Sequence, residues 1–250
     1  MTVFVQDESK NPYGTWKDRR SKHIVHKALG EGVTKLCLIT SGNAGYSLAQ
    51  FAKPHGIKVT SIVDLNLREQ LKNALRGVCY KVIEVDLNKQ IFKPAEVIAL
   101  SREDHKETVW DVTNGYSEAY ASIITDLPHK NPDYLICPVG SGEAFVGLHQ
   151  GLVEHNLKTK LIGVGVLAYP SFADKLSTPW TPYENKIEEI ISEGHTLIRL
   201  TEKQVRAGYE KYKNVYDAEP SAAVAWVGFE QAGVDASANV VIVNSGKGLM

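Results

Sequence analysis

The feature that most constrains the fold is a series of short, continuously apolar runs spread along the chain. In these runs Val, Ile and Leu follow one another without regular polar alternation, which is typical of parallel strands buried on both faces. The expected strands are KLCLIT (35–40), KVTSIV (58–63), KVIEVD (81–86), DYLICPV (133–139), KLIGVGV (160–166) and NVVIVNS (239–245).

Segments with helical spacing lie between these runs and carry glycine or proline near their ends, as helices commonly do. They are NAGYSLAQFAKPHG (43–56), NLREQLKNALRG (66–77) and EAFVGLHQGLVEHN (143–156). The alternation predicts an α/β fold in which helices cover parallel sheets on both sides. NPDY (131–134) has the composition of a joint between two sets of strand–helix units, so we expect two lobes.

Composition excludes several functional classes. The 250 residues are 43% hydrophobic and 23% charged, which suffices for a large core in one or two domains. The formal net charge of −1 provides no basic face, so we expect no nucleic-acid partner. No apolar run approaches the roughly 20 residues of a membrane span, and the N-terminus lacks the pattern of a secretory leader. We therefore expect a cytoplasmic protein with no membrane partner.

Neither the cysteines nor the histidines predict a metal site. Cys37, Cys79 and Cys137 are odd in number, widely spaced and set in apolar runs, which favours buried free thiols. His23 and His26 are one helical turn apart, but no carboxylate partner or third ligand is evident. We expect no bound metal.

Three of the expected strands end in glycine-bearing turns, at residues 41–45, 140–144 and 244–248. Ligands of open α/β sheets bind at the carboxyl ends of the strands, so these turns are the candidate sites.

The second turn lies between an expected strand and an apolar helix, in the stretch PVGSGEAFVGL. Successive backbone N–H groups at the positive end of a helix form a phosphate cradle. Phe145 replaces the third glycine of the dinucleotide motif, and no Lys-Ser/Thr pair follows as in a P-loop. Alternatively, the glycines only form a turn that precedes the helix and bind no ligand. The cradle residues are Gly140, Ser141, Gly142, Glu143 and Ala144, of which Glu143 must turn its carboxylate away from a phosphate.

The other two turns offer groups for a small ligand. In TSGNAG, Thr40, Ser41 and the following N–H groups suit a small carboxylate, and Asn43 suits a ring oxygen. Alternatively, Ser41 or Asn43 caps the next helix. In NSGKG, Ser245 places a hydroxyl at the end of an apolar strand.

Lys17 stands in NPYGTWKDRR (11–20), after a turn-rich lead-in. Taken alone it is a solvated lysine at the start of a helix. A lysine, an anion cradle, a carboxylate-binding turn and a strand-end serine are together the groups that pyridoxal phosphate chemistry requires.

These stretches resemble, in family order, the motifs of the fold-type II pyridoxal-phosphate enzymes, which include threonine synthase, threonine dehydratase, cysteine synthase and the β subunit of tryptophan synthase. NPYGTWKDR resembles N-P-T-G-S-F-K-D-R, AEPSAAVAWVGF (218–229) resembles E-P-S-G-A-A, and NSGKGL resembles T-G-x-G-L. TSGNAG and PVGSGEAFVGL resemble the family's asparagine turn and phosphate loop. The resemblance implies a homodimer, with residues 28–127 as a smaller mobile α/β lobe and residues 1–27 and 128–250 as the larger lobe.

The resemblance also implies roles for individual residues. Lys17 would form the Schiff base with pyridoxal 5'-phosphate and then remove the α-proton of an amino-acid substrate. A serine, rather than a carboxylate, at the ring nitrogen favours loss of a leaving group over transamination. Asn43 would hydrogen-bond the ring hydroxyl, Gly140 to Ala144 would bind the cofactor phosphate, and Ser245 would contact the ring nitrogen. The substrate carboxylate would be bound by Thr40, Ser41, Gly42 and Asn43. The substrate side chain would be contacted by Tyr116 and Ser117.

Within the family, NSGKGLM and EPSAAVA favour threonine synthase, a lyase that performs elimination and replacement, over the runners-up cysteine synthase and serine or threonine dehydratase. Threonine synthase needs a second anion site, for which Lys10 and Lys247 are the candidates. The chain is short ahead of Lys17 for this family, and Gln6 replaces the lysine of the K-x-E-x-x-N-P-T-G approach. A catalytically impaired, cofactor-binding relative with a regulatory or partner-binding role therefore stays an alternative.

Overall fold

The computed structural model describes residues 1–250 except 88, 90, 179 and 250. The described chain divides into two compact units. Unit 1 contains Met1–Trp16 and Ser117–Gly248, and unit 2 contains Lys17–Tyr116 together with Leu249. Each unit is built around a parallel sheet of its own, so the two-lobed α/β fold expected from the sequence is confirmed.

The sheet of unit 1 has the strand order β1-β9-β6-β7-β8, and neighbouring strands are parallel throughout. The apolar runs at 133–139, 160–166 and 239–245 form strands as expected. The strands are β1 (Thr2–Asp7), β6 (Tyr134–Pro138), β7 (Lys160–Val166), β8 (Thr196–Leu200) and β9 (Asn239–Asn244).

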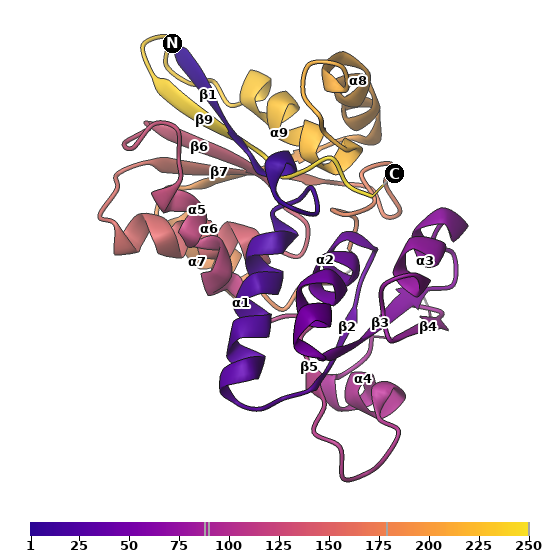
Figure 1. Cartoon of the computed structure of the whole chain (residues 1–250). Coiled ribbons are helices and arrows are strands. Elements are labelled where there is room, and N and C mark those ends of the chain that lie inside the picture. The colour runs from indigo at the N-terminus through magenta and orange to yellow at the C-terminus, as the bar shows by residue number, and fades with distance from the viewer. Residues whose placement is uncertain (88, 90, 179, 250) are drawn as a thin grey trace. The chain divides into compact units, whose positions relative to one another are not determined.

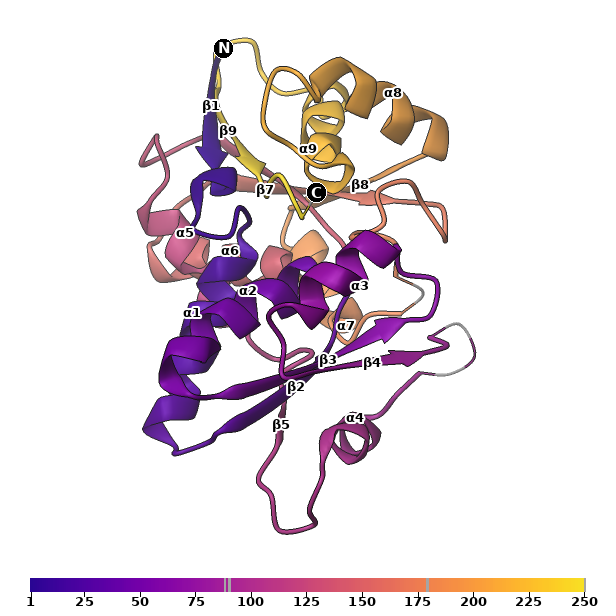
Figure 2. The ribbon, with the colours of Figure 1, turned by 45° about the vertical axis from the view of Figure 1, so that its right-hand side comes forward.

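Helices cover both faces of this sheet, with α5, α6 and α7 on one side and α8 and α9 on the other (Figure 1, Figure 2). Alternate residues of β6 show why both faces are apolar. Leu135 and Cys137 lie in the core under α6 and α7, whereas Ile136 lies in the core under α8 and α9. The helices of unit 1 are α5 (Ser122–Thr125), α6 (Glu143–Glu154), α7 (Glu184–Ser192), α8 (Glu202–Tyr212) and α9 (Pro220–Gln231).

The sheet of unit 2 has the strand order β4-β3-β2-β5 and is also parallel. α1 and α2 pack on one face of it and α4 on the other. The strands are β2 (Lys35–Ile39), β3 (Lys58–Asp64), β4 (Lys81–Val85) and β5 (Trp110–Asp111). The helices are α1 (Lys17–Gly30), α2 (Asn43–Ala52), α3 (Glu69–Arg76) and α4 (Pro94–Ser101), and short 3-10 helices occur at Glu8–Lys10, Lys53–His55 and Ser117–Tyr120.

Each sheet has a point where the chain changes its direction of travel across the strands. In unit 1 the chain runs from β6 outward through β7 to β8 and then returns to β9 on the other side of β6. In unit 2 the same reversal separates β2 from β5. Ligand sites of α/β sheets form outside the carboxyl ends of strands at such reversals. The turns at 140–144 and 245–248, and the turn at 40–43, stand at these positions.

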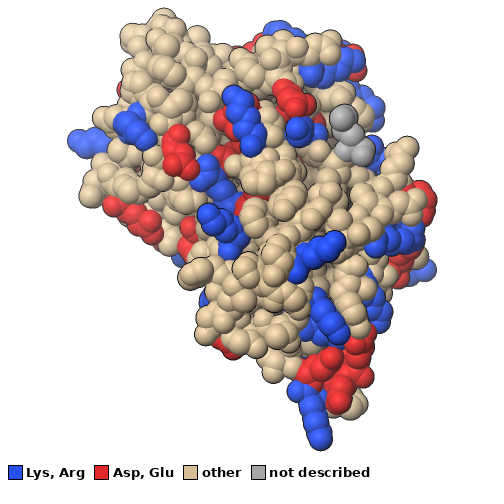
Figure 3. All heavy atoms as spheres, in the orientation of Figure 1, with Lys and Arg blue, Asp and Glu red and all other residues tan. Residues whose placement is uncertain are grey.

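The surface carries lysine, arginine, aspartate and glutamate side chains of both signs interspersed on the face shown in Figure 3. Among the described residues, no helix is long and apolar enough to cross a membrane.

Candidate active site

Three chain segments come together at the carboxyl edge of the unit 1 sheet. They follow the adjacent strands β1, β9 and β6. The first is the lysine turn, defined here as residues 11–17, the second contains Ser245, and the third is the expected phosphate cradle at 140–144. Residues that are far apart in the sequence are thus brought to one edge by strand order alone.

The lysine turn is tied to the end of β9 by backbone contacts. The N–H of Trp16 donates to the carbonyl of Ser245 at 2.9 Å, and Thr15 forms an antiparallel bridge with Gly246. Gly246 has a φ of 145°, and a Cβ there would lie 2.5 Å from the carbonyl oxygen of Gly14. The two backbone segments therefore approach so closely that position 246 requires glycine. Lys17 directly follows Trp16 and begins α1.

Trp16 anchors the chain just before Lys17. Its side chain is buried, and its ring meets Tyr120 edge to face, with 5.5 Å between centroids. On the following helix, the buried carboxylate of Asp18 accepts a hydrogen bond of 2.6 Å from Ser47. Packing fixes the backbone on both sides of the half-buried Lys17.

Ser245 lies where β9 ends, and its residue surface is 5% exposed. Within the part of the chain that the structure describes, its hydroxyl makes no hydrogen bond, although its carbonyl accepts one from Trp16. The preceding side chain, Asn244, donates to Asp7 at 2.9 Å and so holds the end of β9 against the end of β1. A strand-end hydroxyl that the described residues leave unpaired fits a polar atom of a ligand.

The cradle after β6 also has unused donors. Among the described residues, no hydrogen bond is recorded from the backbone N–H groups of Gly140, Ser141, Gly142 or Ala144. They precede or open α6, whose N-terminus carries partial positive charge. Gly142 has a φ of 90°, and a Cβ there would lie 2.5 Å from Ile187 Cδ1. Four unused donors at a helix start fit a phosphate group.

Glu143 turns its carboxylate toward Tyr183 at the start of α7. It is buried, and its Oε1 accepts a hydrogen bond of 3.1 Å from the hydroxyl of Tyr183. The hydroxyl of Thr181 donates to the carbonyl of Ser141. The segment that leads into α7 therefore holds the cradle from outside. Thr181 and Tyr183 belong to KLSTPWTPYE (175–184), a segment that lies where the substrate-facing loops of the resembled family fall, but nothing in the sequence predicts their contacts with the cradle.

In unit 2 the turn after β2 is capped by Thr40 rather than by Ser41. The Thr40 hydroxyl accepts from the N–H of Gly42 at 3.0 Å and from the N–H of Gly45 at 3.2 Å. The N–H of Gly42 is therefore already engaged. Ser41 is exposed and has no hydrogen bond among the described residues. Asn43 is buried, and its Oδ1 accepts from the N–H of Leu249 at 3.2 Å.

Tyr116 and Ser117, the side-chain recognition candidates, lie at the boundary of the two units. Within unit 2, the ring of Tyr116 is buried, with the Arg20 guanidinium 5.4 Å from its centroid. Within unit 1, Ser117 is half-buried, and its carbonyl oxygen would lie 1.9 Å from a Cβ on Gly147. The backbone of Ser117 therefore packs directly against α6 at Gly147.

The cysteines are free, as expected. Burial raises the pKa of the Cys37 thiol to about 12 and that of the Cys79 thiol to about 11. Burial also raises the pKa of Cys137. Because only the thiolate is a strong nucleophile or metal ligand, these cysteines are structural.

One cluster of possible metal ligands lies elsewhere in unit 1. His149, Glu193 and His195 have donor atoms within 4.8 Å of one another, and His149 Nε2 is 2.9 Å from Glu193 Oε2. However, Nδ1 of His195 accepts a hydrogen bond of 3.0 Å from the N–H of Leu161. Neutral His195 then carries its proton on Nε2 and has no open lone pair for a metal.

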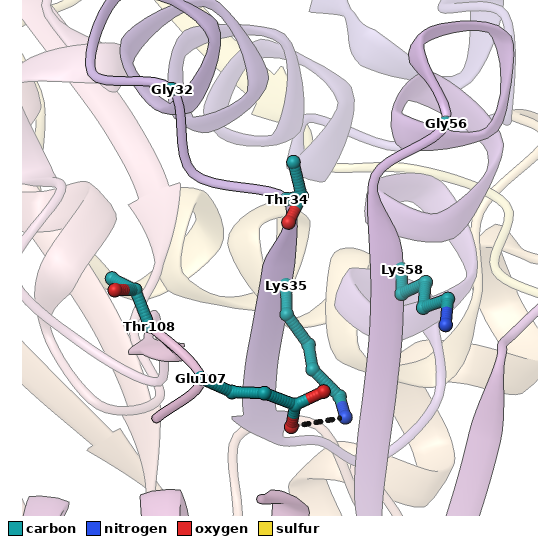
Figure 4. Close-up of a pocket in the computed structure, with 7 residues that line it drawn as sticks. All are labelled: Gly32, Thr34, Lys35, Gly56, Lys58, Glu107 and Thr108. Carbon is teal, nitrogen blue, oxygen red and sulfur yellow. Dashed lines mark hydrogen bonds and ion pairs between the residues drawn. The ribbon is translucent and has the colours of Figure 1, made fainter. Parts of the chain in front are cut away.

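A hollow in unit 2 lies at the amino ends of β2 and β3, the edge opposite to the Thr40 turn (Figure 4). Lys35 and Glu107 form an ion pair of 2.9 Å inside it, and Lys58 lines the same wall. This edge of a parallel sheet is not where ligands bind, and the pair stabilises the unit instead.

The model of the family described as "Pyridoxal-phosphate dependent enzyme" matches residues 1–246. The chain belongs to this family, and its cofactor is pyridoxal 5'-phosphate. The site agrees with that cofactor because the cradle offers unused N–H donors to a phosphate and Ser245 offers a hydroxyl to the ring.

Solved structures show the same fold at low sequence identity. The O-acetylserine dependent cystathionine β-synthase of Helicobacter pylori has a TM-score of 0.80 and 20% identity, covering 98% of this chain and 86% of its own. The L-serine ammonia-lyase of the fungus Rhizomucor miehei has a TM-score of 0.79 and 18% identity, covering 99% and 88%. The serine racemase of Dictyostelium discoideum has the same four values. The neighbours are thus synthases, lyases and racemases on one fold.

Proposed function

We propose that the protein is a pyridoxal-phosphate-dependent lyase or synthase that acts on an amino acid with a β or γ leaving group. The observation that carries this proposal is the hydroxyl of Ser245, a largely buried residue at the end of β9, which has no hydrogen-bond partner among the described residues. A neutral hydroxyl leaves the pyridine nitrogen largely unprotonated. That state favours expulsion of a leaving group over transamination.

When bound, pyridoxal phosphate supplies an aldehyde that joins amines and a conjugated ring that withdraws electrons from the substrate α-carbon. Lys17 would hold the cofactor through its Nζ and would serve as the general base toward the α-proton of the substrate. The N–H groups of the cradle would hold the phosphate, and Asn43 would orient the ring hydroxyl.

The Thr40 turn holds the substrate carboxylate. Ser41 is the best-supported donor there, because its hydroxyl and N–H have no other recorded partner in the described part of the chain. Gly42 contributes less through its N–H, which the Thr40 hydroxyl already accepts. Ser117 remains a proposed contact for the substrate side chain.

Serine-type substrates are better supported than the phosphorylated substrate of threonine synthase. The two lysines nominated for a second anion site are each paired with a carboxylate, Lys10 with Asp7 at 3.3 Å and Lys247 with Asp217 at 3.7 Å. Serine or O-acetylserine needs no second anion site, which favours cysteine synthase or serine/threonine dehydratase chemistry. Threonine synthase stays an alternative that requires one of these pairs to open.

A regulatory or partner-binding role without catalysis is the alternative of another class. The groups for cofactor chemistry, Lys17, Asn43 and Ser245, are all present, which favours an enzyme. We further propose that the protein works in the cytoplasm as a homodimer.

The test begins with the purified protein and its Lys17→Ala variant, both incubated with pyridoxal phosphate and then reduced with borohydride. We expect a visible absorbance band and a cofactor mass on the Lys17 peptide of the wild type, both lost in the variant. O-acetylserine, serine, threonine and O-phosphohomoserine are then added in turn, and products are identified. No band and no label in the wild type would refute the enzymatic proposal, and a band without any product would favour the regulatory alternative.

A further inference from the structure

Glu8 is a buried carboxylate directly after β1, with 1% of its residue surface exposed. Its Oε1 accepts a hydrogen bond of 2.8 Å from the side-chain amide of Gln6, and its Oε2 accepts one of 2.6 Å from the side-chain amide of Asn11. A buried charge is costly unless it is hydrogen-bonded, so these contacts have to be maintained in the folded state. Glu8 therefore has a fixed orientation.

Asn11 extends the contact to the lysine turn. The same Nδ2 that donates to Glu8 also donates to the carbonyl of Thr15 at 3.1 Å, two residues before Lys17. The backbone of the turn is closed by a hydrogen bond of 2.9 Å from the N–H of Gly14 to the carbonyl of Asn11. Glu8 thus reaches the lysine turn through the side chain of Asn11.

Gln6 extends the contact in the opposite direction, to the sheet. Gln6 pairs with Val243 in the register of β1 with β9, two residues before Ser245. The carbonyl of Ser245 then accepts the N–H of Trp16. The contacts form a closed loop that runs from β1 through Glu8, the lysine turn and the end of β9 back to β1.

From this loop we infer that Glu8 is a positioning residue for Lys17, which sets where the lysine turn stands on the carboxyl edge of the sheet. The inference rests on the proposed function, because it assigns Glu8 to the lysine that holds the cofactor. Glu8 acts through Asn11 and Thr15 and takes no part in proton transfer. Its removal should impair attachment of the cofactor to Lys17 more than binding of the cofactor phosphate in the cradle.

Two ligands distinguish attachment of the cofactor to Lys17 from binding of its phosphate in the cradle. Pyridoxal phosphate joins the Lys17 amine through its aldehyde with loss of one water, whereas pyridoxamine phosphate has an amine in that place and cannot. In Glu8→Gln, the carboxylate that accepts from both amides becomes a neutral amide with a single acceptor oxygen, so the hydrogen bond from Asn11 is weakened or lost. We expect the ratio of pyridoxal phosphate affinity to pyridoxamine phosphate affinity to fall about 10- to 100-fold, since small misplacements of reacting groups cost this much.

Asn11→Ala removes the hydrogen bond between Asn11 and Glu8 without altering the Glu8 carboxylate, and it serves as the test if Glu8→Gln does not fold. Asn11→Ala should lower the affinity ratio of the two ligands by a similar factor. The double variant Glu8→Gln/Asn11→Ala should lower this ratio no further, because both substitutions break the connection between Glu8 and the lysine turn. Glu202→Gln is the control. Glu202 also holds a turn, accepting from Ser171 at 2.8 Å and from the N–H of Phe172 at 3.1 Å, but it does not contact the lysine turn.

The results distinguish the inference from the proposed function. If wild type and Lys17→Ala show the same affinity ratio, Lys17 does not hold the cofactor and the proposed function fails. If the wild-type ratio depends on Lys17 but Glu8→Gln and Asn11→Ala weaken both ligands equally, or leave the ratio unchanged, the role of Glu8 is refuted while the proposed function stands.

Discussion

At the scale of single residues, Gly142 shows how little space the cradle leaves. Its φ is 90°, and a Cβ at this position would lie only 2.5 Å from Ile187 Cδ1, so a side chain would strain the backbone and displace the end of the Ile187 side chain. We predict that Gly142→Ala lowers the free energy of unfolding by about 2–4 kcal/mol, from left-handed backbone strain and overpacking together. It should also weaken pyridoxal phosphate binding, because the N–H groups of residues 141–144 would shift.

Gly56→Ala is the matched control for this prediction. Gly56 has a φ of 69°, but nothing lies within 4 Å of a Cβ placed there. It should cost only the strain of about 1–2 kcal/mol and leave cofactor binding unchanged. Urea unfolding and a cofactor titration measure both effects, and equal losses in the two variants would contradict the packing argument.

At the scale of elements, a tyrosine hydroxyl adds a hydrogen bond to the packing between α6 and the segment leading into α7. Tyr183→Phe removes the donor to the buried Glu143 carboxylate. We expect the free energy of unfolding to fall by about 1–2 kcal/mol, because a hydrogen bond to a charged group is lost. Tyr209→Phe, whose hydroxyl has no recorded hydrogen bond among the described residues, should change it by less than about 0.5 kcal/mol. Equal effects in urea unfolding would show that the hydroxyl contact contributes nothing.

Lys35 of β2 forms two ion pairs, with Glu107 at 2.9 Å and with Glu103 at 3.0 Å, and its hydrogen bond lowers the pKa of both carboxyls, which predicts a pH dependence. A hydrogen bond from Lys35, together with backbone N–H donors, lowers the pKa of Glu107 to about 2. A carboxyl whose folded pKa is lowered stabilises the fold above its unfolded pKa, near 4.3, and that stabilisation is lost as pH falls toward the folded value. The melting temperature of Lys35→Met should therefore lie below that of the wild type at pH 6, with a gap that narrows from about pH 4 downward.

Lys58→Met serves as the control for this titration. Lys58 lines the same hollow but forms no ion pair among the described residues, lying instead 4.4 Å from the ring centroid of Tyr80. Its difference from the wild type should not change between pH 6 and pH 3. A Lys35→Met gap that stays constant over this range would exclude the Glu107 pair as its source.

At the scale of the whole molecule, the cofactor should stabilise the fold by mass action. At 100 times its dissociation constant, a ligand that binds only the native state adds about 2.7 kcal/mol, which corresponds to a rise of about 5–10 °C in melting temperature for a chain of this size. Differential scanning fluorimetry with and without pyridoxal phosphate measures the rise. Lys17→Ala should show a smaller rise, and an unchanged wild-type melting temperature would argue against cofactor binding.

The proposed homodimer is a second prediction at this scale. Light scattering coupled to size exclusion should give twice the 27.6 kDa of one chain. A mass of one chain at micromolar concentration would contradict it.

Sequence alone predicted the parts of this molecule whose causes are local. The central strands are continuously apolar because both faces are covered, and the glycine turns follow them directly. The edge strands β1 and β8 were missed because TVFVQD and TLIRL are partly exposed and less continuously apolar. Thr40 was expected to bind the substrate, and its capping bonds were not foreseen. The lobe boundaries at 28 and 127 remain a prediction about motion.

The contacts that support the site were beyond sequence reasoning, because they join distant segments. Tyr183 reaches Glu143 across 40 positions, and Asn244 reaches Asp7 across 237. No local propensity encodes such pairs. They follow from strand order, which had to be observed.

The pairing of β1 with β9 also bears on how the protein is made. β1 is an edge strand whose neighbour in the sheet is formed by Asn239–Asn244, close to the other end of the chain. During synthesis, the segment that carries Lys17 therefore leaves the ribosome long before the strand that it needs. The contacts of the lysine turn with Ser245 and Gly246 cannot form until these residues have emerged, so a nascent or prematurely terminated chain has the lysine without this support.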